Sequence, residues 1–191
     1  MGDLTTLLEA ARLGDEVALD QLCSVMYREL RQLAHARLKR SEHITLLDTT
    51  SLVHEAYLRL TKLGRLNVTD RSHFLAYAAR VMRSIIVDFV RQRRAERRGG
   101  EQRQVTLDTD IAESAHAEID QVIRVNDALL DLEQVDGRLV RVVEMRYFAG
   151  MSEQEIAACL GVTGRTVRRD WEKARSLLSA ALQAPALAST P

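Results

Sequence analysis

The basic side chains near the C-terminus are spaced as a polyanion-binding surface on a helix would require. Val167, Trp171, Ala174 and Leu178 follow one another at steps of four, three and four, which predicts a buried helical stripe. The opposite face carries Arg165, Arg168, Arg169 and Lys173. Guanidinium groups bind guanine edges and phosphates through two parallel hydrogen bonds, and the neighbouring Thr166 offers a hydroxyl for a phosphate or a methyl for thymine.

The residues before this stripe predict a helix-turn-helix. Ser152 and Glu155 have the spacing of a capping box, which starts a helix. Gly161 stands where the chain must turn with a positive φ, and Thr163 is suited to cap the second helix. An ordinary pair of bundle helices with a solvated arginine face is the alternative. The two caps and the glycine in register favour DNA binding instead.

A second group of basic residues lies on a long helix expected over residues 73–94. It comprises Arg80, Arg83, Arg91, Arg93 and Arg94. Such a density of charge binds phosphates strongly through counterion release, although a solvated face is the simpler interpretation. Asp88 and Arg91, one turn apart, would then pair with each other. Phe74 and Tyr77 have rings that stack on unpaired bases or pack in a core, and the core is favoured for Phe74.

The zero net charge conceals three blocks of opposite sign. Residues 71–103 contain nine arginines and three acids, a net charge of +6. Residues 104–136 contain nine acids and one arginine, a net charge of −8, and residues 137–191 return to +3. Two basic surfaces joined by a segment that avoids a polyanion account for this order.

Composition and periodicity predict an all-α fold. Aromatic residues make up 4% of the chain and prolines number two, and apolar residues recur at helical steps without strand-like alternation. We expect two small helical domains, over residues 1–98 and 118–184, an acidic flexible linker over residues 99–117 and a disordered tail over residues 185–191.

Other classes of protein fit less well. A two-domain response regulator would need an α/β receiver, and residues 1–98 show no parallel-strand pattern. The five histidines have no metal-ligand spacing, and no phosphate loop or nucleophile elbow is present, which argues against an enzyme. Without a membrane span or secretion signal, and with Cys23 and Cys159 as apolar fillers, we expect a cytoplasmic protein with no cofactor and no membrane contact. A scaffold that binds a polymerase without selecting DNA remains a third alternative.

Three stretches together resemble the extracytoplasmic-function (ECF) group of sigma-70 factors. One is Leu52-Val53-His54-Glu55-Ala56-Tyr57-Leu58-Arg59-Leu60, which is similar to the helix with which the family binds polymerase. The second, residues 81–91, resembles the helix that engages the −10 element. The third, residues 166–175 with their Arg-Asp-Trp, resembles the −35 recognition helix.

The resemblance implies a sigma-2-like first domain and a sigma-4-like second domain. The partners it implies are the beta-prime clamp helices and beta flap of core RNA polymerase, promoter DNA and an anti-sigma factor or Ser/Thr kinase. Contacts with the polymerase are expected from Asp48, Thr50, Ser51, Leu52, His54 and Glu55. Contacts with the −10 element are expected from Arg80, Arg83, Ser84, Arg91, Arg93 and Arg94, and with the −35 element from Arg165, Thr166, Arg168, Arg169 and Lys173.

Two departures from the family pattern bear on function. Ser84 stands where the family often has asparagine, and its shorter side chain leaves the preferred −10 base open. Thr50 and Ser51 stand where members usually carry acids. We hypothesise that phosphorylation of Thr49, Thr50 or Ser51 restores this charge and switches on polymerase binding; the alternative is that these residues only cap the helix.

Overall fold

The computed structural model describes residues 4–38, 47–62, 68–99 and 109–183, and all regular structure within them is helical. The predicted all-α class is therefore confirmed. The first group of helices is α1 (Leu4–Leu13), α2 (Glu16–Val25), α3 (Tyr27–Leu38), α4 (Thr49–Thr61) and α5 (Arg71–Gly99). The second is α6 (Thr109–Val143), the π-helical turn η2 (Glu144–Phe148), α7 (Glu153–Leu160) and α8 (Gly164–Gln183). None of these helices is long and apolar enough to cross a membrane.

The core of the first group forms where α3, α4 and α5 pack together. Its fully buried side chains are Leu22, Met26, Leu30, Leu52, Leu60, Phe74, Met82 and Val90. The prediction that Phe74 is a core residue is confirmed, since its side chain has no exposed surface. Aspartates cap the N-termini of α2 and α4. At α2, Asp15 accepts hydrogen bonds from Val17 N and Ala18 N, at 2.9 and 3.1 Å.

The second group packs α8 against the C-terminal half of α6. Leu129, Leu132, Leu139 and Val140 meet the buried face of α8 around Ala174. A further cluster of Val142, Met145, Met151, Ile156 and Val167 joins η2 to the helix-turn-helix. The path of α6 bends at Asp136, whose φ and ψ of −160° and 96° are not helical. Its carboxylate accepts from Arg138 N at 3.0 Å and so caps the helical stretch that follows.

The predicted bounds of the linker, residues 99–117, were wrong. Residues 109–117 belong to α6, and the helix continues to Ile119 and Ile123, which are buried in the core of the first group. The sequence shows no sustained apolar stripe over residues 99–117, and Ile119 and Ile123 are buried by a part of the chain distant in sequence, so a local pattern could not reveal the helix. Residues 100–108 and the predicted tail, residues 185–191, lie outside the described residues.

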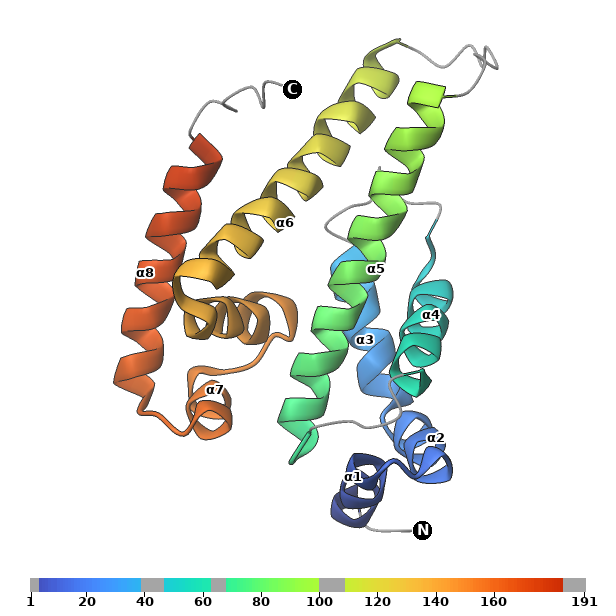
Figure 1. Ribbon diagram of the computed structural model, residues 1–191, viewed down its shortest axis with the longest axis vertical. Helices are drawn as coiled ribbons and strands as arrows, with labels where there is room; N and C mark the ends of the chain where they lie inside the picture. Colours follow the sequence, from blue (N-terminus) through green and yellow to red (C-terminus); the bar gives the residue numbers. More distant parts are fainter. Residues whose placement is uncertain (1–3, 39–46, 63–67, 100–108, 184–191) are drawn as a thin grey trace.

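The arrangement places the two longest helices beside each other. Figure 1 shows α5 and α6 side by side across the middle of the molecule, with α1 to α4 beyond α5 and with α7 and α8 beyond α6. The buried isoleucines of α6 make this a packed contact and not a gap. The two halves of the chain therefore meet along a helix pair.

Two glycines of the second group should respond oppositely to alanine. Gly161 has a φ of +64° and Gly137 lies just after the bend of α6, and a Cβ would meet no atom within 4 Å at either position. Gly161→Ala should lower the free energy of unfolding by about 1–2 kcal/mol, because only the left-handed backbone opposes it. Gly137→Ala should raise it by about 0.5 kcal/mol. Urea unfolding of both variants checks the pair, and equal effects would contradict the strain at Gly161.

Candidate nucleic-acid interface

The helix-turn-helix has the predicted local geometry. The capping box is complete: Ser152 Oγ accepts from Glu155 N at 3.3 Å, and Glu155 Oε2 accepts from Ser152 N at 2.8 Å. Gly161 is left-handed, with φ and ψ of 64° and 34°. Thr163 Oγ1 accepts from Thr166 N at 3.3 Å and so caps α8. These predictions are confirmed. Each feature depends only on neighbours in the chain, which is why the sequence alone could predict it.

The two faces of α8 differ as its sequence spacing predicts. Val167 and Ala174 are buried and Trp171 is partly buried against α6 and η2. Arg165, Arg168, Arg169 and Lys173 are exposed, and Thr166 is half-buried. Arg168 bonds Glu153 of α7 at 3.2 Å yet keeps 67% of its side chain exposed. The basic face is thus open to a ligand, while the apolar face holds the helix on its domain.

Two charged groups that fix α8 were not identified from the sequence. Asp170 is 2% exposed, and its Oδ2 lies 2.8 Å from Arg138 Nε on α6. Arg146 of η2 lies over the Trp171 ring, with its guanidinium carbon 4.8 Å from the ring centroid. An acid inside a basic stretch is the one local signal of such an anchor. Its partners come from distant positions, and spacing alone does not show them.

The arginines predicted on the long helix are present on α5 but engage acids of the same chain. Arg91 bonds Asp127 at 2.9 Å and Arg94 bonds Asp120 at 3.5 Å. Arg93 lies over the ring of Phe89, 5.7 Å from its centroid. The expected Asp88–Arg91 pair is wrong: Asp88 Oδ2 binds Arg59 of α4 at 2.9 Å instead. The helix places Arg91 toward α6 and Asp88 toward α4, so each meets a different neighbour.

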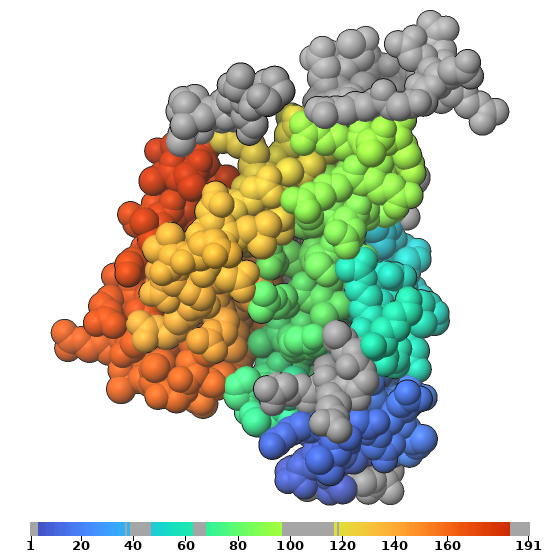
Figure 2. Space-filling view, viewed as in Figure 1, coloured from blue at the N-terminus to red at the C-terminus, as the bar shows by residue number. Residues whose placement is uncertain are grey.

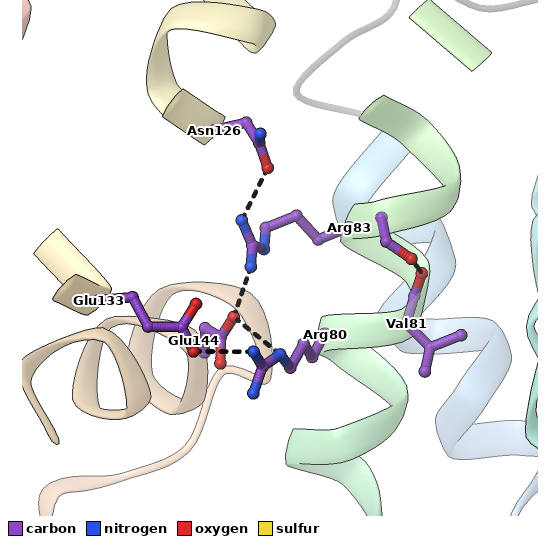
Figure 3. Close-up of polar contacts among 7 residues, drawn as sticks. Arg80, Val81, Arg83, Asn126, Glu133 and Glu144 are labelled. Carbon is purple, nitrogen blue, oxygen red and sulfur yellow. Dashed lines mark hydrogen bonds and ion pairs between the residues drawn. The ribbon is translucent and has the colours of Figure 1, made fainter. Parts of the chain in front are cut away.

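The most buried of these contacts surrounds Arg83. Its side chain is 11% exposed; it donates to Glu144 Oε1 at 2.7 Å and to Asn126 Oδ1 at 2.9 Å, as Figure 3 shows. Arg80 donates to Glu133 at 2.9 Å and lies 3.9 Å from Glu144. Burial raises the pKa of Glu144 despite the opposing effect of the two arginines. The network joins the two halves of the molecule.

A family model for ECF sigma factors matches residues 1–184. The chain belongs to the ECF sigma factor family. No curated protein gives a significant match. Among solved structures, CnrH in complex with the cytosolic domain of CnrY is similar at 24% identity, covering 95% of this chain and 99% of that chain with a TM-score of 0.40. That likeness is too distant to add to the family match. The sigma factor family consists of transcription initiation factors, and an enzymatic role does not follow from any match.

The helix of this sigma factor predicted to bind polymerase is α4. Asp48 caps it: Asp48 Oδ1 accepts from Thr50 N at 2.7 Å and Ser51 N at 3.0 Å, and Oδ2 accepts from Ser51 Oγ at 2.8 Å. The bonds from Ser51 chiefly lower the pKa of Asp48. Thr50, Ser51 and His54 are exposed, and Thr49 and Glu55 are partly buried.

One residue assigned to this binding surface belongs elsewhere. Leu52 was predicted to contact polymerase, but its side chain has no exposed surface and lies in the core. The helical period turns Leu52 inward together with Val53, and it turns Ser51 and His54 outward. Leu52 therefore holds α4 in place.

The hydroxyl of Ser84, which is predicted to contact the −10 element, already has two hydrogen-bond partners within the chain. Ser84 Oγ donates to Val81 O at 2.8 Å and accepts from Arg59 at 3.0 Å. Arg59 also pairs with Glu55 and Asp88, and so links α4 to α5. The role of Arg59 was not identified from the sequence, because the packing of α4 on α5 is what brings Asp88 and Ser84 near it.

A second polar bridge crosses between the halves near the start of α5. His73 Nε2 lies 3.0 Å from the carbonyl oxygen of Cys159 in α7, and Nδ1 lies 2.7 Å from Asp70 Oδ2. Possible ligand atoms of Asp70, His73 and Cys159 lie within 4.8 Å of one another, the arrangement of a small metal site. Both ring nitrogens already lie within hydrogen-bond distance of oxygen atoms of the same chain, however. We interpret the cluster as a hydrogen-bond bridge.

The capping box gives a test of the helix-turn-helix. Ser152→Ala should lower the free energy of unfolding by about 1 kcal/mol at neutral pH, since it removes a cap. Hydrogen bonds from Ser152 hold the pKa of Glu155 below its ordinary 4.5, so their stabilisation is present above pH 4.5 and lost as pH falls through the lowered pKa. Urea unfolding of both proteins over an acidic pH series checks this. A difference that stayed constant into strong acid would contradict the role of the carboxylate.

Proposed function

We propose that this chain is an alternative sigma factor that binds core RNA polymerase and selects promoters through their −10 and −35 elements. The observation that carries the proposal is the capped helix-turn-helix whose recognition helix buries Val167 and Ala174 and exposes a row of basic side chains. In this motif the early residues of the second helix enter the major groove. The family match over residues 1–184 supports the same role.

The proposal assigns three surfaces. The −35 duplex is contacted by Arg165, Thr166, Arg168, Arg169 and Lys173 on α8. The −10 element is contacted by Arg80, Arg83, Ser84, Arg91, Arg93 and Arg94 on α5. Core polymerase is contacted by Asp48, Thr50, Ser51, His54 and Glu55 on α4. In this proposal the first domain contacts the beta-prime clamp helices of the polymerase, and the second domain contacts the beta flap.

Neutralising α8 should remove the upstream promoter contacts. Arg165→Ala, Arg168→Ala and Arg169→Ala together should abolish −35 protection, because each arginine bound to a base contributes about 1–3 kcal/mol. Run-off transcription with core polymerase on genomic fragments would first supply a promoter, and footprinting then measures the loss. The matched control removes the same charge from exposed arginines of α1 and α3, Arg12, Arg28 and Arg31. Unchanged −35 protection in the first variant would contradict the proposal.

We further propose that phosphorylation near the start of α4 switches on polymerase binding. Thr50 is exposed at the N-terminus of α4, where the helix dipole favours an anion. A phosphate there supplies about −1.5 to −2 charges. Ser51 is less suited, because its hydroxyl already donates to Asp48 and a phosphate would lie against that carboxylate. Thr49 is partly buried, which leaves Thr50 as the best acceptor of the three.

Variants of Thr50 test the switch. Thr50→Glu should strengthen binding to core polymerase, and Thr50→Ala should make binding insensitive to treatment with a Ser/Thr kinase. Surface-bound core polymerase with titrated sigma factor measures both. Thr6→Glu, on an exposed residue of α1, adds the same charge away from the proposed contact. Identical binding by all variants, treated or not, would eliminate the switch and leave Thr50 as a capping-region residue.

A further inference from the structure

The basic face of α5 is covered by acids from the other half of the chain. Four ion pairs form this contact, which we call the latch: Arg80–Glu133 and Arg91–Asp127 at 2.9 Å, Arg83–Glu144 at 2.7 Å and Arg94–Asp120 at 3.5 Å. All four arginines are among those assigned to the −10 element. In this conformation they are occupied before any nucleic acid arrives.

The latch is a continuous strip and not a set of scattered contacts. Positions 80, 83, 91 and 94 fall on one side of a helix, at steps of three, eight and three. The partners of Arg80, Arg91 and Arg94 follow in reverse order along α6, as two antiparallel helices require: they are Glu133, Asp127 and Asp120. Arg83 pairs instead with Glu144 of η2, beyond the bend of α6. Figure 2 shows α6 lying directly against α5 along this strip. A nucleic-acid backbone would present a similar row of negative groups to this basic helix.

The pairs of the latch differ in burial and therefore in how easily a polyanion can replace the acid. Glu144 and Arg83 are 5% and 11% exposed, so this pair is costly to disrupt and fixes how the helices meet. In the other three pairs every side chain is between 33% and 55% exposed. Exposed pairs are weak and screened by salt, so a competing polyanion can exchange with them one at a time. Ile119 and Ile123 add an apolar contact that a polyanion does not compete for.

We propose that the acidic strip of α6 and η2 is an internal stand-in for nucleic acid, which masks the −10 surface of α5 until DNA phosphates displace it. The proposal rests on the proposed function, which assigns the arginines of α5 to DNA. The basic face of α8 has no such cover, since Arg168 and Arg169 are 67% and 73% exposed. The closed chain therefore offers its −35 surface first and its −10 surface only after the latch opens.

Neutralising the exposed acids of the latch tests the masking. Asp120→Asn, Asp127→Asn and Glu133→Gln together leave Glu144 and all arginines in place. The probe is fluorescein-labelled single-stranded DNA of randomised sequence, titrated by anisotropy over a salt series. Freeing three arginines should tighten binding and steepen the slope of log affinity against log salt by about 2, from roughly 0.7 per phosphate contact. X-ray scattering should show a larger radius of gyration for the variant without DNA.

A second variant controls for net charge. Glu9→Gln, Glu16→Gln and Asp131→Asn remove the same three charges at exposed positions that take part in no ion pair among the described residues. This control should leave both the salt slope and the radius of gyration unchanged. If the latch variant and the control gave the same slope, or if only the radius changed, the stand-in for DNA would be overturned.

The outcome is separable from that of the proposed function. The binding assay contains no polymerase, so its result does not depend on the sigma factor role, and the exposed basic face of α8 is the same in the latch variant and in its control. Absence of run-off transcription by the natural chain, untreated and kinase-treated, and by Thr50→Glu would overturn the sigma factor role, whatever the latch variant does. Transcription that proceeds normally while the latch variant binds DNA like its control would overturn the masking and leave the sigma factor role intact.

Discussion

A buried ion pair, Arg83 with Glu144, determines how the two halves of the molecule meet. Two charges withdrawn from water are stable only when their remaining hydrogen-bonding groups are satisfied, and Asn126 and Arg80 supply part of this. The guanidinium carbon of Arg83 also lies 5.9 Å from the centroid of the Phe148 ring in η2. An arginine held from three sides permits only one register of α5 on α6. The positions of the exposed pairs and of the helix-turn-helix follow from that register.

The same residue cannot satisfy the latch and a DNA phosphate together. Arg83 has a single guanidinium group, and both of its terminal nitrogens donate within the chain. Use of Arg83 by DNA therefore requires α6 and η2 to move away from α5, and movement of α6 also uncovers Ile119 and Ile123. That exposure of apolar surface opposes opening and keeps the closed form populated. Under the proposed function, binding to polymerase or DNA would supply the free energy of opening, and the affinity of α5 for DNA would depend on the equilibrium between the closed and open conformations.

Local features were predictable from the sequence and long-range features were not. Ser152, Glu155, Gly161 and Thr163 act on near neighbours, and each has the predicted geometry. The family motif assigns Leu52 to a binding surface, whereas its place on the apolar face of the helix buries it in the core. The acidic block was interpreted as a segment that avoids a polyanion, whereas its carboxylates pair with the basic block before it. Blocks with net charges of +6 and −8 attract each other, so the charge pattern predicts contact between the two segments as much as their separation.

The asymmetry between the two basic surfaces follows from where their acids lie. On α8 the pairing acids, Glu153 and Asp170, come from the same domain, and neither covers the outer face of the helix. Asp170 is turned inward to Arg138 and anchors α8; it also lies 3.6 Å from Arg169, whose side chain nevertheless stays 73% exposed. On α5 the acids come from a different part of the chain and lie over the arginines themselves. A rearrangement between the halves thus changes the charge that α5 presents while leaving α8 unaltered, which makes α5 the surface on which control of DNA binding can act.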